Sequence, residues 1–272
     1  MRAAALPLLL PLLLVAACTP AGAQREHGGV VSIDYCADQT MLALVDRSDI
    51  RAVSPEAASD ARHAGPLARG LPVVRPDLES ILALNPATVV RSYGGGPALA
   101  GQLRRHGITV VDLGYAATLA DARRELLSAG DALGSAAVAA RLAARMDGQL
   151  AAARDGHPRG SLLYITPGDV TTGPDSFVAD IMRSAGYASY RTQPGWGSLP
   201  LEALTRTAPS HVLRAFYDSP AYRQDHWSTA AHPALARALK GVPETQVPGA
   251  WVACGNWLGG NAVAALARDS AA

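Results

Sequence analysis

Cysteine, net charge and aromatic residues are all scarce in this sequence. Only 3 of the 272 residues are cysteines, and they show neither the CxxC spacing of a zinc module nor the density of a disulfide scaffold. The 24 basic and 23 acidic side chains leave a net charge of +1, which provides no basic patch for nucleic acid or anionic lipid. Because 49% of the residues are hydrophobic, the chain can still bury a sizeable core. We therefore expect a folded protein with no nucleic-acid partner.

The signatures of common enzyme active sites are also missing. The sequence has no GxSxG nucleophile elbow and no HExxH zinc motif, and the run 94–96 of three glycines lacks the Lys-Ser/Thr of a phosphate-binding loop. Asp34 and Asp38 could form a carboxylate pair, but no nucleophile or base stands beside them, and capping of the following helix explains them more simply. We expect a protein that is not an enzyme and keep a periplasmic α/β enzyme as an alternative.

The first 23 residues are typical of an export signal. Arg2 precedes an apolar run at 3–17 that contains two prolines and is shorter than the roughly 20 residues of a membrane span. Cleavage before Cys18 would leave a lipidated cysteine, whereas cleavage after Ala23 would release a protein that begins at Gln24. The sequence leaves both routes open, and both predict a periplasmic mature protein.

Short apolar runs alternate with amphipathic stretches along the rest of the chain, which is the pattern of βα units around parallel sheets. Proline is absent from 118–154, where leucines recur at helical spacing, and Gly134-Ser135 is typical of a helix end followed by a new helix. The sequence therefore predicts an α/β fold of two Rossmann-like lobes with parallel central sheets, at 24–134 and 155–272, joined by a single long helix at 135–154. The predicted strands are 29–33, 50–54, 88–92, 109–113, 161–165, 211–215 and 244–247.

The two predicted lobes share a repeated unit. Leu78-Glu79 begins a helix that leads through a proline into a strand, and 123 residues later Leu201-Glu202 does the same. Five of the sixteen aligned positions are identical. The repeat indicates pseudo-equivalent lobes and makes Glu79 and Glu202 a matched pair.

Aromatic and glycine residues follow many of the predicted strands. In open parallel sheets, ligands bind beyond the carboxyl ends of the strands. Aromatic rings beside glycines suit a large, flat, partly apolar ligand, although tyrosine and tryptophan are also common as half-buried residues at loop starts. The candidate ligand-binding residues are Tyr35, Cys36, Asp38, Tyr93, Tyr115, Pro167, Gly173, Trp196, Phe216, Tyr217 and Trp257. Whether Arg91 and Arg214 face the same site is open, because side chains alternate along a strand and each arginine points to the face of the sheet opposite that of the residues next to it in the strand.

Several of these stretches resemble the substrate-binding proteins of ABC importers for iron complexes, haem and cobalamin. The resemblance covers about 30–267. It is most specific at 32–39, 77–86, 195–197 with 201–202, and 251–255. It implies two lobes joined by one rigid helix, a ligand held between the lobes, delivery without catalysis, and no resident cofactor. The implied ligand is a chelated metal complex, with cobalamin or a ferric siderophore favoured over haem.

The resemblance also implies a protein partner. In this family, one glutamate of each lobe meets arginines of the permease dimer, and Glu79 and Glu202 stand at the matching positions. The alternative is an ordinary solvated glutamate in a first helical turn, where it suits the helix dipole. We expect a monomer that docks on an inner-membrane ABC permease.

Cys36 and Cys254 both fall in loops expected at the ligand site. In an oxidising compartment, two spare cysteines pair more often than they stay free, so we predict a Cys36–Cys254 disulfide. A thiolate bound to an iron or cobalt centre, or two inert thiols, are the alternatives.

A bare zinc or manganese ion is a rival ligand. Such an ion needs several His and Asp/Glu side chains that converge on one point. The seven histidines of the chain show no such grouping, so we predict no metal site built from protein side chains.

Overall fold

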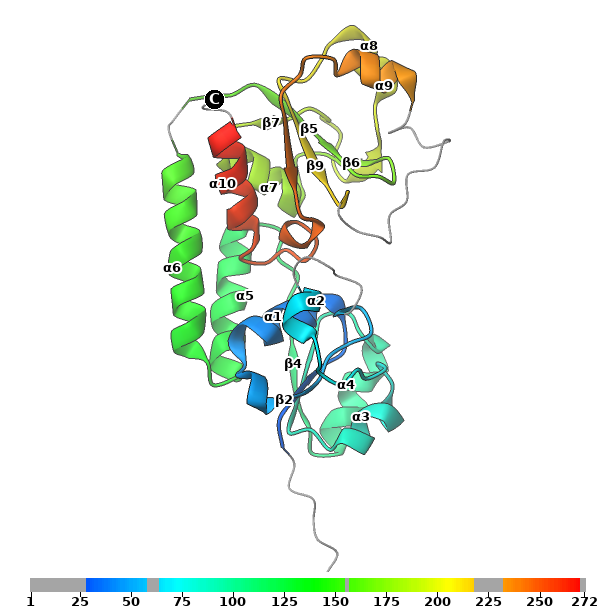
Figure 1. Cartoon of the computed structure of the whole chain (residues 1–272), viewed down its shortest axis with the longest axis vertical. Coiled ribbons are helices and arrows are strands. Elements are labelled where there is room, and N and C mark those ends of the chain that lie inside the picture. The colour runs from blue at the N-terminus through cyan, green and yellow to red at the C-terminus, as the bar shows by residue number, and fades with distance from the viewer. Residues whose placement is uncertain (1–27, 58–63, 155–156, 218–231, 270–272) are drawn as a thin grey trace, which may run out of the picture.

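The computed structural model describes residues 28–57, 64–154, 157–217 and 232–269 (Figure 1). The predicted signal peptide, both of its cleavage sites and Cys18 lie outside these residues. Among the described helices, none combines the length and the apolar character needed to cross a bilayer.

A four-stranded parallel sheet forms the centre of the N-terminal lobe. Its strand order is β2-β1-β3-β4, made of β1 (Val30–Ser32), β2 (Ile50–Ala52), β3 (Thr88–Arg91) and β4 (Thr109–Asp112). The helical segments of this lobe are α1 (Tyr35–Leu44), η1 (Arg47–Asp49), α2 (Ala64–Ala68), α3 (Leu78–Leu84) and α4 (Gly96–Arg105). Val89 and Val90 are both fully buried, as expected for a parallel sheet covered on two faces.

The C-terminal lobe repeats this arrangement. Its parallel sheet consists of β5 (Ser161–Ile165), β7 (Ala188–Ser189), β9 (His211–Ala215) and β10 (Glu244–Val247). The order β7-β5-β9-β10 is the order β2-β1-β3-β4 of the first lobe, so the second strand of each central sheet lies at an edge beside the first. The helical segments are α7 (Phe177–Ser184), α8 (Leu201–Arg206), α9 (Pro233–Ala238), η4 (Gly249–Trp251) and α10 (Gly259–Asp269). An antiparallel pair, β6 (Val170–Thr172) and β8 (Trp196–Ser198), is present in this lobe and has no equivalent among the described residues of the other.

Two long helices connect the lobes. α5 (Leu119–Ala132) begins with a capping box between Thr118 and Asp121, and α6 (Ala136–Ala153) follows it after Gly134, whose φ of 68° is in the left-handed region that favours glycine. The strands of the N-terminal sheet precede α5 and those of the C-terminal sheet follow α6, so the described chain passes between the lobes along α6 (Figure 1). α6 matches the predicted linking helix at 135–154.

The connecting helices share a hydrophobic core with the C-terminal lobe. Leu119 and Leu126 of α5 and Met146 of α6 are at most 2% exposed, and they belong to one cluster with buried residues of β5, α7 and α10. Full burial of a side chain of this size contributes roughly 1.5–3 kcal/mol. The α5–α6 pair is therefore a rigid part of the structure rather than a flexible linker.

The predicted fold class of two parallel α/β lobes is confirmed. The seven predicted strands are all present within a few residues, whereas β6, β7 and β8 were missed. Each of these three strands contains a single apolar residue, so none of them shows an apolar run like those of the predicted strands.

Candidate functional site

The carboxyl ends of both central sheets point toward the opposite lobe (Figure 1). Cys36, which follows β1, and Cys254, which follows β10 and η4, are joined by a disulfide with their Cα atoms 5.4 Å apart. The loops after the strands of both sheets therefore lie close together, at the position where open parallel sheets bind ligands.

Tyr93 and Glu56 form the exposed part of the N-terminal side of this site. The Tyr93 hydroxyl donates to Glu56 Oε2 at 2.9 Å, and the same carboxylate oxygen accepts the backbone N–H of Tyr35 at 2.8 Å. Burial and the Glu56 carboxylate raise the pKa of Tyr93 above its ordinary value. The Tyr93 hydroxyl is therefore protonated at neutral pH, while the residue as a whole remains 54% exposed.

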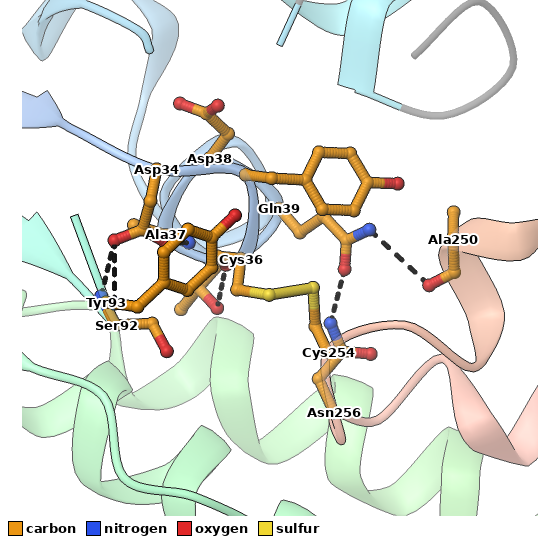
Figure 2. Close-up of a disulfide and its surroundings, with 12 residues drawn as sticks. Asp34, Cys36, Ala37, Asp38, Gln39, Ser92, Tyr93, Ala250, Cys254 and Asn256 are labelled. Atoms are coloured by element: carbon orange, nitrogen blue, oxygen red, sulfur yellow. Dashed lines mark hydrogen bonds between the residues drawn. A yellow bond between two sulfur atoms is a disulfide. The ribbon is translucent and has the colours of Figure 1, made fainter. Parts of the chain in front are cut away.

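A buried carboxylate holds this side of the site in place. Asp34 is 1% exposed, and its Oδ1 caps α1 by accepting the N–H of Ala37 at 2.9 Å. Its Oδ2 accepts the N–H groups of Ser92, Tyr93 and Gly94 at 2.7, 3.1 and 2.9 Å. Figure 2 shows Asp34 beside Ser92 and Tyr93. One side chain thus fixes both the start of α1 and the loop that carries Tyr93.

Trp196 is the exposed aromatic residue of the C-terminal side. It lies in β8, paired with β6, and its ring meets Tyr164 edge to face with centroids 6.2 Å apart. The preceding loop is held by Arg191, whose guanidinium donates to the carbonyls of Gln193, Pro194 and Gly195. Trp196 nevertheless remains 55% exposed.

Arg91 and Arg214 are held by acidic residues of neighbouring strands. Arg91 is 7% exposed and lies 3.3 Å from Asp112 of β4, and it donates to the carbonyl of Gly96. Arg214 donates to Glu244 of β10 at 2.7 Å and lies over the ring of Tyr217, whose hydroxyl it also contacts. Both arginines therefore have partners within their own lobe.

Two predicted ligand-binding residues are buried polar or aromatic groups with structural partners. Asp38 is 0% exposed and accepts hydrogen bonds from Ser32 and from the N–H and hydroxyl of Ser54. Burial raises its pKa, and these hydrogen bonds oppose the shift. Trp257 is 7% exposed and packs in the core shared with α5 and α6. Both side chains are almost fully buried, and their role as ligand contacts remains a prediction.

Gly173 and Pro167 are also buried, and their role as ligand contacts remains a prediction. A Cβ added to Gly173 would lie 1.8 Å from the carbonyl oxygen of Gln193, so this glycine allows two loops of the C-terminal lobe to pack closely. Pro167 lies inside a turn that Thr166 closes through hydrogen bonds with the N–H and carbonyl of Val170. Both residues therefore contribute to the conformation of loops in the C-terminal lobe.

The other predicted ligand residues remain predictions. Tyr115 is 82% exposed, whereas Phe216 and Tyr217 are half-buried. Phe216 adopts a left-handed φ of 69°, and its ring lies against Gly249, where an added Cβ would be 2.3 Å from it. Tyr35 and Cys36 are also half-buried.

Glu56 was missed, and Asp34 was considered as half of a carboxylate pair and as a helix cap but not as a residue of the ligand site. Both follow strands of the N-terminal sheet, so the rule that ligands bind beyond the carboxyl ends applies to them too. Only the folded structure shows that Asp34 collects N–H groups from residues 58 to 60 positions away.

Glu79 and Glu202 occupy equivalent positions in the structure. Each is the second residue of a helix, α3 or α8, and each is exposed. The internal repeat seen in the sequence thus corresponds to a structural equivalence. Their role in docking remains a prediction.

Comparisons with known proteins agree with this architecture. A comparison with curated protein sequences found no match. Similar solved structures include the periplasmic heme-binding protein RhuT from Roseiflexus sp. RS-1 (19% identity, TM-score 0.70, 90% of this chain and 98% of that chain) and BhuT in complex with two hemes (21%, 0.70, 90% and 98%). The vitamin B12 binding protein BtuF of Vibrio cholerae is also similar (16%, 0.64, 90% and 96%). The family profile described as "Periplasmic binding protein" matches residues 30–225. The chain therefore belongs to the periplasmic binding protein family, as an extracytoplasmic solute-binding protein rather than an enzyme.

Proposed function

We propose that this protein captures a bulky chelated metal complex between its two lobes and delivers it to an ABC permease. The observation that carries the proposal is the exposure of two aromatic residues, 54% for Tyr93 and 55% for Trp196. Tyr93 follows β3 of one sheet, and Trp196 lies in β8, which pairs with β6, the strand that follows β5 of the other sheet. Exposed aromatic side chains beyond the carboxyl ends of parallel strands suit a ligand-binding site. Corrin, porphyrin and catecholate rings all present flat apolar surface to such side chains.

The proposed ligand is cobalamin, a ferric siderophore or haem. Among the similar solved structures are a complex with two hemes and a vitamin B12 binding protein, which supports this class of ligand without separating its members. A bare zinc or manganese ion has less support, because within the described residues no three His, Cys, Asp or Glu side chains are grouped so that they could hold a metal.

Ligand titration tests this proposal. Mature protein is titrated with haemin, cyanocobalamin and ferric catecholate and hydroxamate siderophores while tryptophan fluorescence and the melting temperature are measured. A ligand that binds only the folded state raises stability by about 2.7 kcal/mol at one hundred times its Kd. Trp196→Ala should weaken binding, whereas Trp251→Phe, a change beside α6 and α10, serves as the control. Lack of binding by every probe at micromolar concentration would contradict the proposal.

We further propose that Glu79 and Glu202 dock on the permease. Exposed ion pairs contribute little to stability but can determine partner recognition. Glu79→Arg and Glu202→Arg should abolish uptake of the ligand in cells while ligand affinity and melting temperature stay unchanged. Asp131→Arg, at another exposed acidic residue, is the matched control. Normal uptake with both glutamates reversed would rule out this role.

A further inference from the structure

The lobes are joined at a second place besides α6. The disulfide links Cys36, in the first turn of α1, to Cys254, in the loop between η4 and α10, across 218 positions of sequence. Gln39, one turn further along α1, reaches the same loop: its Oε1 accepts from Asn256 Nδ2 at 2.5 Å, and its Nε2 donates to the carbonyl of Ala250 at 3.4 Å. Figure 2 shows this amide pair beside the disulfide, on the side opposite Asp34 and Tyr93. A covalent bond and a pair of amides therefore attach α1 to the C-terminal lobe.

We call this attachment of α1 to the C-terminal lobe, made by the Cys36–Cys254 disulfide and the Gln39–Asn256 pair, the joint. It is tightly packed. Gln39 is 1% exposed and Asn256 is 9% exposed. Residues of both lobes line a cavity of only about 30 Å³ beside the disulfide, which is room for one or two water molecules. A Cβ added to Gly255 would lie 2.8 Å from the carbonyl oxygen of Ala116. Because a buried amide that loses its partner costs free energy, the pair favours one relative position of the lobes.

The disulfide also limits how far the lobes can separate. Cα atoms of bonded cysteines usually lie about 4.4–6.8 Å apart. The observed separation of 5.4 Å leaves about 1.4 Å for opening at this point. The α5–α6 pair alone would permit rotation where it meets the N-terminal lobe, whereas a second attachment at α1 removes most of that freedom.

The joint is directly connected to the N-terminal side of the ligand site. Tyr35 precedes Cys36 in the chain, and its N–H donates to Glu56 Oε2, the oxygen that also accepts from the Tyr93 hydroxyl. The position of the disulfide therefore determines where Tyr35, Glu56 and Tyr93 stand relative to the C-terminal lobe.

We propose that the Cys36–Cys254 disulfide, together with Gln39 and Asn256, positions the two sides of the ligand site by holding the lobes at a fixed angle. The effect on affinity rests on the proposed function, whereas the restraint on the lobes does not. A preformed site loses less conformational entropy on binding, so removal of the joint weakens ligand affinity by about tenfold while both sheets stay folded.

The Cys36→Ser/Cys254→Ser double variant of the unliganded protein tests the restraint. Hydrogen exchange should become faster in peptides that cover 35–44 and 249–258 and stay unchanged in β5 and β9. Small-angle X-ray scattering should show a larger radius of gyration. Affinity is then measured with haemin, cyanocobalamin and a ferric catecholate siderophore.

Gln39→Met provides a second test that keeps the disulfide and decides the question if the double variant does not fold. Its matched control is Gln149→Met, which breaks a similar amide pair, Gln149 Nε2 to Asn261 Oδ1 at 2.7 Å, between α6 and α10. Faster exchange at 249–258 in Gln39→Met but not in Gln149→Met supports the proposal. Unchanged exchange in Gln39→Met, or unchanged exchange and scattering in a folded double variant, overturns it. Failure of the wild type to bind any probe counts against the proposed function alone.

Discussion

The two lobes share one strand order but hold their ligand-site loops by different means. The repeat offset of 123 makes Leu213 the counterpart of Val90. Val90 pairs with Ser32 and Leu213 pairs with Tyr164, so Tyr164 is the counterpart of Ser32. Two residues further along, Thr166 is therefore the counterpart of Asp34. Asp34 collects four backbone N–H groups, whereas the hydroxyl of Thr166 only closes its own turn. The C-terminal lobe instead presents Trp196 from the β6–β8 ladder. The same topology can therefore support a binding surface through one buried carboxylate or through backbone pairing.

Removal of the Asp34 carboxylate should have the largest effect on stability. Asp34→Ala leaves four N–H groups without their acceptor and should lower the free energy of unfolding by about 3–5 kcal/mol. Thr166→Val, at the counterpart position, should cost about 1 kcal/mol. Urea denaturation of both variants measures the difference. Equal losses would show that the N-terminal loop does not depend on Asp34.

Aromatic substitutions compare the two sides of the ligand site. Trp196→Ala removes the exposed ring of the C-terminal lobe and should weaken ligand binding by about 10- to 100-fold, in line with an aromatic anchor in an interface. Tyr93→Phe keeps its ring and loses only the hydrogen bond to Glu56, so we expect a change of no more than about fivefold. Titration with the tightest probe measures both. A larger loss for Tyr93→Phe would assign the hydroxyl a direct role in ligand recognition.

His211 makes the stability of the lobes differ in acid. It aligns with Thr88 of the N-terminal lobe, is 3% exposed and contacts Thr245, which donates to Asp269. Burial lowers the pKa of His211 below 6.5, although Asp269 and Glu244 oppose the shift. The unfolded state therefore binds a proton below pH 6.5 that the folded state does not. As the pH is lowered below 6.5, the free energy of unfolding decreases by up to about 1.4 kcal/mol per pH unit.

Thermal unfolding from pH 7.5 to 5.5 measures this slope. His211→Gln should flatten it, and His106→Gln, at an exposed histidine, should leave it unchanged. A slope that survives His211→Gln would place the acid sensitivity elsewhere.

Helix capping gives the smallest expected difference between the lobes. Asp77 caps α3 by accepting the N–H and hydroxyl of Ser80, whereas Pro200 at the start of α8 has no capping side chain. These hydrogen bonds lower the pKa of Asp77 below 3.8. The cap therefore stabilises α3 above pH 3.8 and is lost as the pH falls through the folded-state pKa. Asp77→Ala should lower the melting temperature slightly at pH 7 and have no effect in strong acid. A lower melting temperature that persists in strong acid would contradict the capping role.

The order of strands and helices could be predicted largely from local pattern. Short apolar runs marked seven strands, and Gly134 marked the end of α5, because burial and left-handed backbone impose strong local preferences. The fate of individual loop residues could not be predicted this way. In the sequence, Asp38 and Trp257 met the same criteria for ligand contacts as Tyr35 and Tyr93. Only the packing of the folded chain shows that Asp38 and Trp257 are buried.

The sequence by itself determined two pseudo-equivalent α/β lobes, a linking helix, and the pair Glu79 and Glu202, because periodicity, turn residues and an internal repeat are local properties of a chain. The tertiary structure alone decided which polar groups face inward. Asp34 and the loop at 92–94 meet across about 60 positions, and Gln39 meets Asn256 across more than 200. Such partners are chosen by the packing of whole elements, since a buried polar group is stable only where the folded chain brings it a hydrogen-bonding partner.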